Sequence, residues 1–192
     1  MTEIYLASKS PRRRQLLDRL GVKYEVLDVE VAEHWDGKET PRDYVARLAL
    51  EKARAGRKAA PRPLPVLGAD TEVVLDEHVL GKPADRDDAM RMLLSLSGRT
   101  HLVYSAVALV HGREEVRVHV SRVTFRRLNG EECARYCDTD EPYDKAGGYA
   151  VQGGAAAFIT GLEGSYSGVM GLPLEETREL LRITGINGVR LD

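Results

Sequence analysis

The chain has 192 residues, of which 43% are hydrophobic and 30% charged, and its formal net charge at pH 7 is −2. This length predicts one domain over residues 1–192, and the near-neutral charge argues against a nucleic-acid binder or an electrostatic membrane anchor, because both need a basic excess. No apolar run reaches the length of a membrane span and the opening stretch lacks the pattern of a signal peptide, so we expect a cytoplasmic protein with a local anion site.

The chain opens with a short buried strand, predicted over residues 3–8, and continues into a helix that begins at Pro11. Ser10 is a favourable N-cap and proline suits the first helical position, so free backbone N–H groups lie at this end of the helix. Arg12 and Arg13 add positive charge at the same place, where the helix dipole also favours an anion. A phosphate would fit there, although a capped surface helix with solvated arginines is an equally open interpretation.

A second strand is predicted over residues 22–31, and a polar loop follows it. Thr40 and the proline after it repeat the pattern of cap and first helical residue, which predicts a helix over residues 41–55. Residues 56–65 include three prolines, and we expect them to form a mobile surface connection rather than helix.

The sharpest single residue is Asp70, because it ends an otherwise apolar strand predicted over residues 65–71. Ligands commonly bind at strand ends in α/β folds, where a carboxylate can hold a divalent metal or activate water. The alternative, that Asp70 only caps the next turn through its side chain, is equally open. A short hairpin and a helix over residues 85–96, capped by Asp85, are predicted to follow.

Two long strands, over residues 100–110 and 115–125, are predicted to form an antiparallel hairpin. The apolar positions change parity within the second strand, which predicts a β-bulge near residues 121–122. Asn129 and Glu132 form a capping-box pattern at the start of a further helix. The two cysteines on that helix match neither a disulfide framework nor a zinc motif, so we expect them to be reduced.

Residues 139–154 are rich in Asp, Gly and Tyr without a clear period, which makes them a candidate functional loop. Gln152 offers both a donor and an acceptor for a base edge, and the glycines let the backbone approach a ligand closely. An ordinary turn-rich surface loop is the alternative. The remaining chain predicts a strand over residues 155–159, a glycine-rich loop over 161–171 and a closing helix over 173–184.

Three further charged residues are candidates for a phosphate or metal site. Lys52 and Lys82 each carry a compact ammonium group that suits a polyphosphate oxygen, although taken alone each is more often a solvated lysine. Glu33 could share a divalent metal with Asp70, since hard cations prefer carboxylate oxygens. The five histidines show no metal spacing, and the chain contains no Walker sequence.

Five short segments, in order along the chain, resemble the motifs of the Maf family of nucleoside triphosphate pyrophosphatases. They are Ser8-Lys9-Ser10-Pro11-Arg12-Arg13, Gly68-Ala69-Asp70-Thr71, Gly81-Lys82-Pro83, residues 140–153, and Gly171-Leu172-Pro173-Leu174. Each segment alone is weakly specific. Five ordered matches that span nearly the whole chain are highly specific.

The resemblance implies an α/β fold in which a mixed β-sheet with flanking helices forms two lobes around a cleft, as in inosine triphosphatases. It implies hydrolysis of a nucleoside triphosphate between the α and β phosphates, to a monophosphate and pyrophosphate, with a divalent cation (Mg²⁺ or Mn²⁺) as cofactor. The implied substrates are dTTP and UTP, with modified pyrimidine nucleotides as further candidates. A homodimer is compatible with the resemblance.

The resemblance also implies roles for individual residues. Asp70 is similar to the family's proton acceptor and, with Glu33, would hold the metal. The substrate contacts would be Ser8, Arg12, Arg13, Lys52, Thr71, Lys82 and Gln152. Among these contacts, Arg12, Thr71 and Gln152 resemble the branch of the family that acts on dTTP and UTP.

Two other functions stay open at the level of the sequence. A nucleotide-sensing regulator of septum formation could use the same cleft without essential catalysis. A nucleotidyltransferase could also use these groups, but it would need a second acceptor pocket that the sequence does not identify. Release of pyrophosphate and monophosphate from dTTP, with no acceptor added, would separate the three.

Overall fold

The computed structural model describes residues 1–187, and at its centre is a mixed sheet in the strand order β2-β1-β3-β5-β6-β7, with β4 beside β3. The strands are β1 (Ile4–Ala7), β2 (Tyr24–Val26), β3 (Val66–Leu75), β4 (His78–Val79), β5 (Thr100–His111), β6 (Arg113–Phe125) and β7 (Ile159–Glu163). β1 runs parallel to β2 and β3, whereas the other pairs are antiparallel. The expected α/β fold with a mixed sheet is confirmed.

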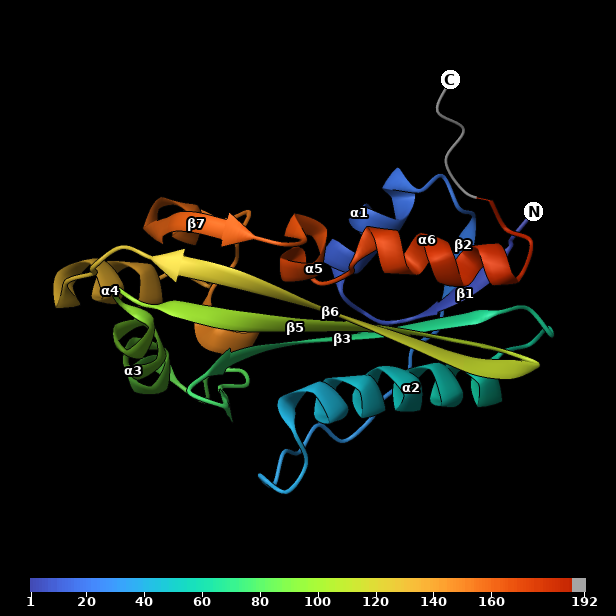
Figure 1. Cartoon of the computed structure of the whole chain (residues 1–192), viewed down its shortest axis with the longest axis horizontal. Helices are drawn as coiled ribbons and strands as arrows, with labels where there is room; N and C mark the ends of the chain where they lie inside the picture. Colours follow the sequence, from blue (N-terminus) through green and yellow to red (C-terminus); the bar gives the residue numbers. More distant parts are fainter. Residues whose placement is uncertain (188–192) are drawn as a thin grey trace.

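Helices flank this sheet, as the sequence predicts (Figure 1). They are α1 (Pro11–Arg19), α2 (Pro41–Ala59), α3 (Arg86–Leu96), α4 (Gly130–Cys137), α5 (Tyr166–Met170) and α6 (Leu174–Ile183). In Figure 1, α2 lies along one side of the sheet, α1, α5 and α6 lie on the other, and α3 and α4 gather at the end where β7 lies. Within residues 1–187, no helix combines the length and the apolar composition that crossing a lipid bilayer requires.

Local caps begin four of these helices where the sequence predicts. The side chains of Ser10, Thr40, Asp85 and Asn129 each accept a hydrogen bond from the backbone N–H three residues further along. Glu132 completes the capping box of α4. Each bond satisfies a backbone donor that a helix leaves unpaired, so residues adjacent in sequence fix these helix starts.

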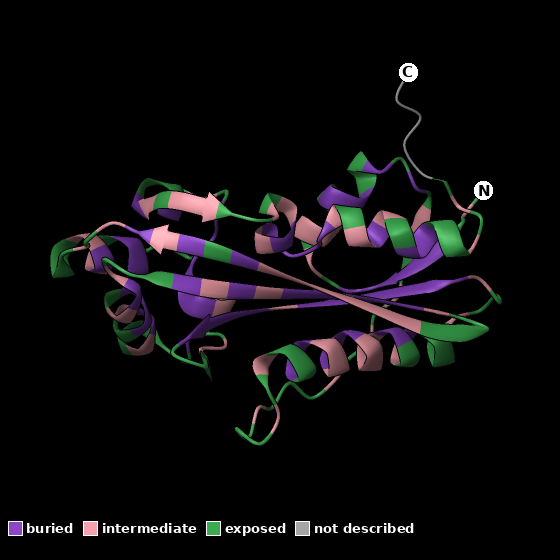
Figure 2. Ribbon diagram, viewed as in Figure 1, coloured by how far each residue is buried: buried purple, intermediate pink, exposed green. Residues whose placement is uncertain are grey.

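Two apolar clusters at opposite ends of the long strands β3 and β5 form the cores of two lobes. One cluster packs α1 and α6 against β1 and the beginning of β3, and the other packs α3 and α4 against the end of β3 and the end of β6. A smaller cluster buries the small residues of α2 against β5. Figure 2 shows the central strands largely buried and the outer sides of the helices exposed. The two buried thiols of α4, Cys133 and Cys137, are unpaired, as expected.

β6 pairs with β5 in continuous register from end to end, so the bulge predicted near residues 121–122 is wrong. The apolar parity changes for another reason. Val116 and Val118 pack against the α2 cluster, whereas Val123 and Phe125 face the opposite side and join the cluster of α3 and α4. The strand keeps its register because the cover moves from one face of the sheet to the other along its length.

Helix α2 is longer than predicted and continues through Gly56 to Ala59, where a surface connection was expected. A Cβ atom at Gly56 would lie 2.8 Å from side-chain carbons of both Ala7 and Val66, so glycine lets the helix approach the sheet closely. The prolines of the segment begin after the helix ends. The prolines therefore lie beyond the end of the helix, whereas Gly56 allows close packing and does not interrupt it.

Two strand predictions also differ from the structure. The segment Gly154–Phe158 is a short 3₁₀ helix, and the strand expected there begins after it as β7. A residue distant in sequence holds the start of this 3₁₀ helix, since the carboxylate of Glu141 accepts a hydrogen bond from the backbone N–H of Gly154 at 2.9 Å. The glycine-rich loop expected next is occupied by β7 and the short helix α5. β2 covers three residues of the longer strand that was predicted.

Candidate active site

A cleft of about 750 Å³ opens along one edge of β3. β1 pairs with β3 only as far as Gly68, and β4 pairs with it only from Val74, so no strand of residues 1–187 pairs on that side with the stretch between them. The other edge of the same stretch is held by β5. The gap between β1 and β4 therefore exposes the middle of a buried strand to the cleft.

All nine residues that the sequence analysis assigned to a site line this cleft. They are Ser8, Arg12, Arg13, Glu33, Lys52, Asp70, Thr71, Lys82 and Gln152. Asp70, however, lies in the middle of β3 rather than at its end. The strand that ends near this position is β1, whose last residue, Ala7, pairs with Gly68. Open backbone at Asp70 comes from the short neighbour, not from the end of its own strand.

The start of α1 forms one wall of the cleft. Arg13 is fixed by two bonds: its Nε donates to the carbonyl of Gly171 at 2.8 Å, and its Nη1 donates to Ser8 Oγ at 3.3 Å. Burial lowers the pKa of Arg13 from its usual value, and the negative charge of Asp70 opposes that shift. Arg12 instead reaches Asp144, with Nη1 3.1 Å from Oδ2. One arginine is thus held rigidly and the other forms an ion pair across the cleft.

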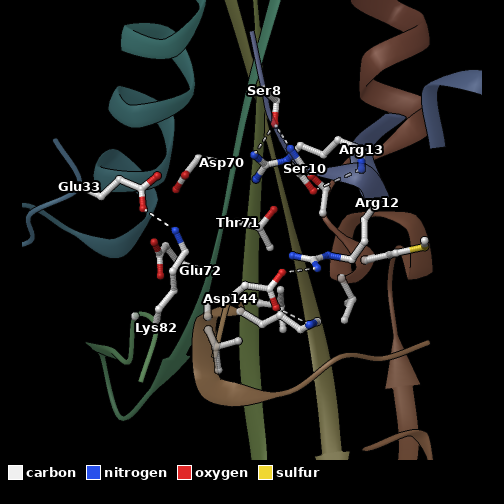
Figure 3. A pocket seen from close by; sticks show the side chains of 18 of the residues that line it. Ser8, Ser10, Arg12, Arg13, Glu33, Asp70, Thr71, Glu72, Lys82 and Asp144 are labelled. Atoms are coloured by element: carbon white, nitrogen blue, oxygen red, sulfur yellow. Dashed lines mark hydrogen bonds and ion pairs between the residues drawn. The ribbon is translucent and has the colours of Figure 1, made fainter. Parts of the chain in front are cut away.

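Lysines and carboxylates form the opposite wall (Figure 3). Lys52 Nζ donates to Asp70 Oδ1 and to Glu33 Oε1, both at 2.6 Å, and Lys82 Nζ donates to Glu33 Oε2 at 3.0 Å. Partial burial would raise the pKa of Glu33, but the bonds and positive charges of the two lysines outweigh it and lower the pKa to about 2. Both lysines are therefore already neutralised by carboxylates when no substrate is bound.

Glu72 is a cleft residue that the sequence analysis missed. It follows Asp70 by two positions on β3, so both side chains project from the same face of the strand. Burial, and next the negative charge of Asp70, raise the pKa of Glu72 to about 8. The available signal was its parity, because two acidic residues share one face of a strand whose other positions are almost all apolar.

A buried pair supports the loop that carries Gln152. His101 Nε2 lies 2.7 Å from the hydroxyl of Tyr149, and burial lowers the pKa of His101 to about 4. Tyr149 packs in the cluster of α3 and α4, whereas Val151 packs in the cluster of α1 and α6. The chain crosses between the two lobes here, immediately before Gln152, which is exposed at the cleft. Neither the pairing of His101 with Tyr149 nor this crossing can be predicted from the local sequence.

The carboxylates of the cleft are suited to a divalent cation. Within residues 1–187, no group of three or more His, Cys, Asp or Glu side chains is gathered as a ready metal cluster. Asp70 Oδ2 is nevertheless a buried oxygen without a hydrogen-bond partner among the described residues. A buried acceptor that lacks a donor is costly, and an oxygen of this kind is the ligand that Mg²⁺ and Mn²⁺ prefer.

Comparison with known proteins finds close relatives over nearly the whole chain. A family described as "Maf-like protein" matches residues 3–184. The dTTP/UTP pyrophosphatase of Alkalilimnicola ehrlichii is 57% identical over 183 residues, covering 93% of this chain and 91% of that protein. The dTTP/UTP pyrophosphatase of Saccharophagus degradans is 52% identical, covering 93% and 87%. A solved nucleoside-triphosphatase / dITP/XTP pyrophosphatase from Mycobacterium abscessus gives a TM-score of 0.46 at 25% identity, covering 65% of this chain and 75% of that one.

Proposed function

This chain belongs to the Maf-like protein family, and we propose that it hydrolyses dTTP and UTP between the α and β phosphates to a monophosphate and pyrophosphate. Relatives at 52–57% identity are named for these two substrates. The observation that carries the proposal is a buried carboxylate, Asp70, in a cleft that is also lined by Arg12, Arg13, Lys52 and Lys82. Modified pyrimidine nucleotides are further candidate substrates.

The basic side chains would bind the triphosphate. A nucleoside triphosphate carries roughly four negative charges, and phosphoryl transfer depends largely on positioning and charge neutralisation. Arg13 and the N-terminus of α1 offer donors that are already fixed in place. Arg12, Lys52 and Lys82 would exchange their carboxylate partners for phosphate oxygens, with Ser8 as a further polar contact.

Asp70 would orient and deprotonate the attacking water. Its Oδ1 atom is held by Lys52, while the unpartnered Oδ2 atom is available to a water or a cation. Asp70 and Glu33 would hold the divalent cation, Mg²⁺ or Mn²⁺. When bound, this cation offsets the charge that develops on the leaving pyrophosphate.

Substrate choice is proposed to depend on Arg12, Thr71 and Gln152. Thr71 projects from the face of β3 opposite Asp70 and is hydrogen-bonded to Ser105 at 2.9 Å. Gln152 has both a donor and an acceptor with which to bind a pyrimidine edge. We propose that this one domain acts in the cytoplasm on free nucleotides, without nucleic acid, and that a homodimer is its natural assembly.

A panel of nucleoside triphosphates tests the proposal. Each triphosphate is incubated with the protein and Mg²⁺ or Mn²⁺, with no acceptor added, and pyrophosphate and monophosphate are measured. We expect dTTP and UTP to release both products faster than the purine triphosphates. Binding without product release would favour a nucleotide-sensing role, and release only after an acceptor is added would favour a transferase.

A further inference from the structure

Glu72 is a buried carboxylate for which the fold alone gives no reason. Its exposed fraction is 6%, and its Oε2 atom is buried without a hydrogen-bond partner among the described residues. The three residues that follow it on β3 are apolar, and a valine in its place would carry no polar cost. A buried carboxyl oxygen without a hydrogen-bond donor destabilises the fold, so a ligand that satisfies it is the natural explanation.

The two lysines nearest the carboxylates of the cleft are bonded to residues other than Glu72. Lys52 Nζ bonds to Asp70 and Glu33, and Lys82 Nζ bonds to Glu33. In Figure 3 the Glu72 carboxylate lies on the same side of the cleft as Asp70 and Lys82. The carboxyl group of Glu72 is therefore left unsatisfied by these two lysines.

Among the described residues, two buried carboxylate oxygens of the cleft lack a hydrogen-bond partner, one on Asp70 and one on Glu72. Asp70 is 3% exposed, and its Oδ2 atom, like Glu72 Oε2, lacks a partner within the described part of the chain. The two residues project from one face of β3 at an i, i+2 spacing of about 6.7 Å, which carboxylate side chains can bridge by holding one ion between them. Both oxygens of Glu33, in contrast, already accept bonds from lysines.

We propose that Glu72 is a ligand of the divalent cation in this cleft and that it binds the cation together with Asp70. This inference rests on the proposed function for the role of the cation, and it names a cation ligand beyond Asp70 and Glu33. Glu33 stays a ligand in the proposed function, although its two oxygens accept bonds from Lys52 and Lys82 before substrate binds. The chemistry favours a hard cation such as Mg²⁺ or Mn²⁺, because the open ligands are carboxylate oxygens.

Binding of Mn²⁺ to the nucleotide-free protein tests this assignment. Free Mn²⁺ is followed by electron paramagnetic resonance while the full-length protein is titrated, and the wild type is compared with Glu72→Gln, which keeps the shape of the side chain and cannot ionise. We expect the dissociation constant to rise at least about tenfold in Glu72→Gln and to be partly restored in Glu72→Asp. Thermal unfolding of each variant confirms that it is folded.

A matched control comes from a half-buried carboxylate outside the cleft. Glu176 on α6 also has a buried oxygen without a partner among the described residues, and its other oxygen pairs with His119. Glu176→Gln is expected to leave Mn²⁺ binding unchanged. An unchanged dissociation constant in Glu72→Gln would overturn the inference, as would a wild type that binds no Mn²⁺ without nucleotide.

The same proteins separate this inference from the proposed function. A wild type that binds Mn²⁺ through Glu72 but releases no pyrophosphate from dTTP would refute the hydrolysis and leave the cation site standing. A wild type that hydrolyses dTTP while Glu72→Gln binds Mn²⁺ normally would refute the site and leave the hydrolysis standing.

Discussion

At the scale of single residues, basic side chains of the cleft pair with its carboxylates. Asp70 is held by Lys52 on one oxygen and is open on the other, so it keeps a defined orientation while presenting a free lone pair to the cleft. A carboxylate in this state suits the activation of a water better than a solvated one, because its direction is already fixed. The chemistry is expected to depend on this one side chain.

Replacing Asp70 by asparagine is expected to lower pyrophosphate release from dTTP by at least about a hundredfold while leaving the protein folded. Asparagine keeps the volume but cannot accept the proton of the attacking water. Asp138→Asn is the matched control, since Asp138 is exposed at the end of α4 and pairs with Arg86. Near-normal turnover of dTTP by a folded Asp70→Asn protein would refute the assigned role.

His101 makes a separate prediction about pH. Its pKa falls from 6.5 to about 4 because it is buried, edge-on to Phe125 and Tyr149. Below pH 6.5 His101 binds a proton in the unfolded chain, whereas in the folded protein it binds one only below about pH 4. The free energy of unfolding should therefore fall by about 3 kcal/mol between these pH values through this residue.

The His101→Gln variant tests that sign, because glutamine can still reach the Tyr149 hydroxyl but does not titrate. Urea unfolding at pH 7 and at pH 4.5 should show a smaller loss of stability on acidification in the variant than in the wild type. Equal losses in both proteins would show that His101 does not carry the acid sensitivity.

At the scale of elements, a seam of small residues brings α2 close to the sheet. Ala49, Ala53 and Gly56 face Gly68 and the end of β1. Because no side chain separates the two backbones there, Lys52 on the same helix comes within 2.6 Å of Asp70. The packing of the helix therefore sets the geometry of the site.

Gly68→Ala is expected to destabilise the protein by about 3 kcal/mol. The added Cβ would lie 2.4 Å from the carbonyl oxygen of Ala49 and 2.5 Å from the backbone nitrogen of Ala53, and backbone atoms cannot move aside cheaply. The matched control is Gly130→Ala in α4, where a Cβ meets nothing within 4 Å. In urea unfolding, comparable midpoints for the two variants would contradict this account of the seam.

At the scale of the whole molecule, the cleft lies between the two apolar cores. Arg12, on the helix of one lobe, is paired with Asp144, in the loop that leads into the other. The chain crosses between the cores over residues 149–151. A triphosphate that replaces the Arg12 partner would contact elements of both lobes, so its binding should stabilise the molecule as a unit.

A dTTP analogue with an imido group between the α and β phosphates should therefore raise the melting temperature in the presence of Mg²⁺. At a concentration of 100 Kd the gain is about 2.7 kcal/mol, which corresponds to roughly 5–10 °C for a chain of this size. Thymidine, which lacks the phosphates, serves as the comparison and should give a much smaller shift. Equal shifts for the two ligands would argue against the basic walls as the main binding surface.

The nine expected residues that line the cleft and the starts of four helices could be predicted from the sequence itself. Caps such as Ser10 and Asn129 act over three or four residues, so local pattern suffices to find them. The order of the motifs identified the cleft residues, including Asp70, although it could not say how they meet. Failures occurred where a distant partner decides, as at Gly56 and at the 3₁₀ segment anchored by Glu141.

Only the tertiary structure decided that Asp70 lies mid-strand at an open edge, that Lys52 binds it, and that Glu72 Oε2 is buried without a partner among residues 1–187. Each of these facts depends on which strands end beside β3 and which helix covers it. Strand neighbours and burial are contributed by segments far apart in the chain, and a local pattern carries no record of them. The sequence predicted which side chains line the cleft, and the fold determined which of them are available to bind a cation and a substrate.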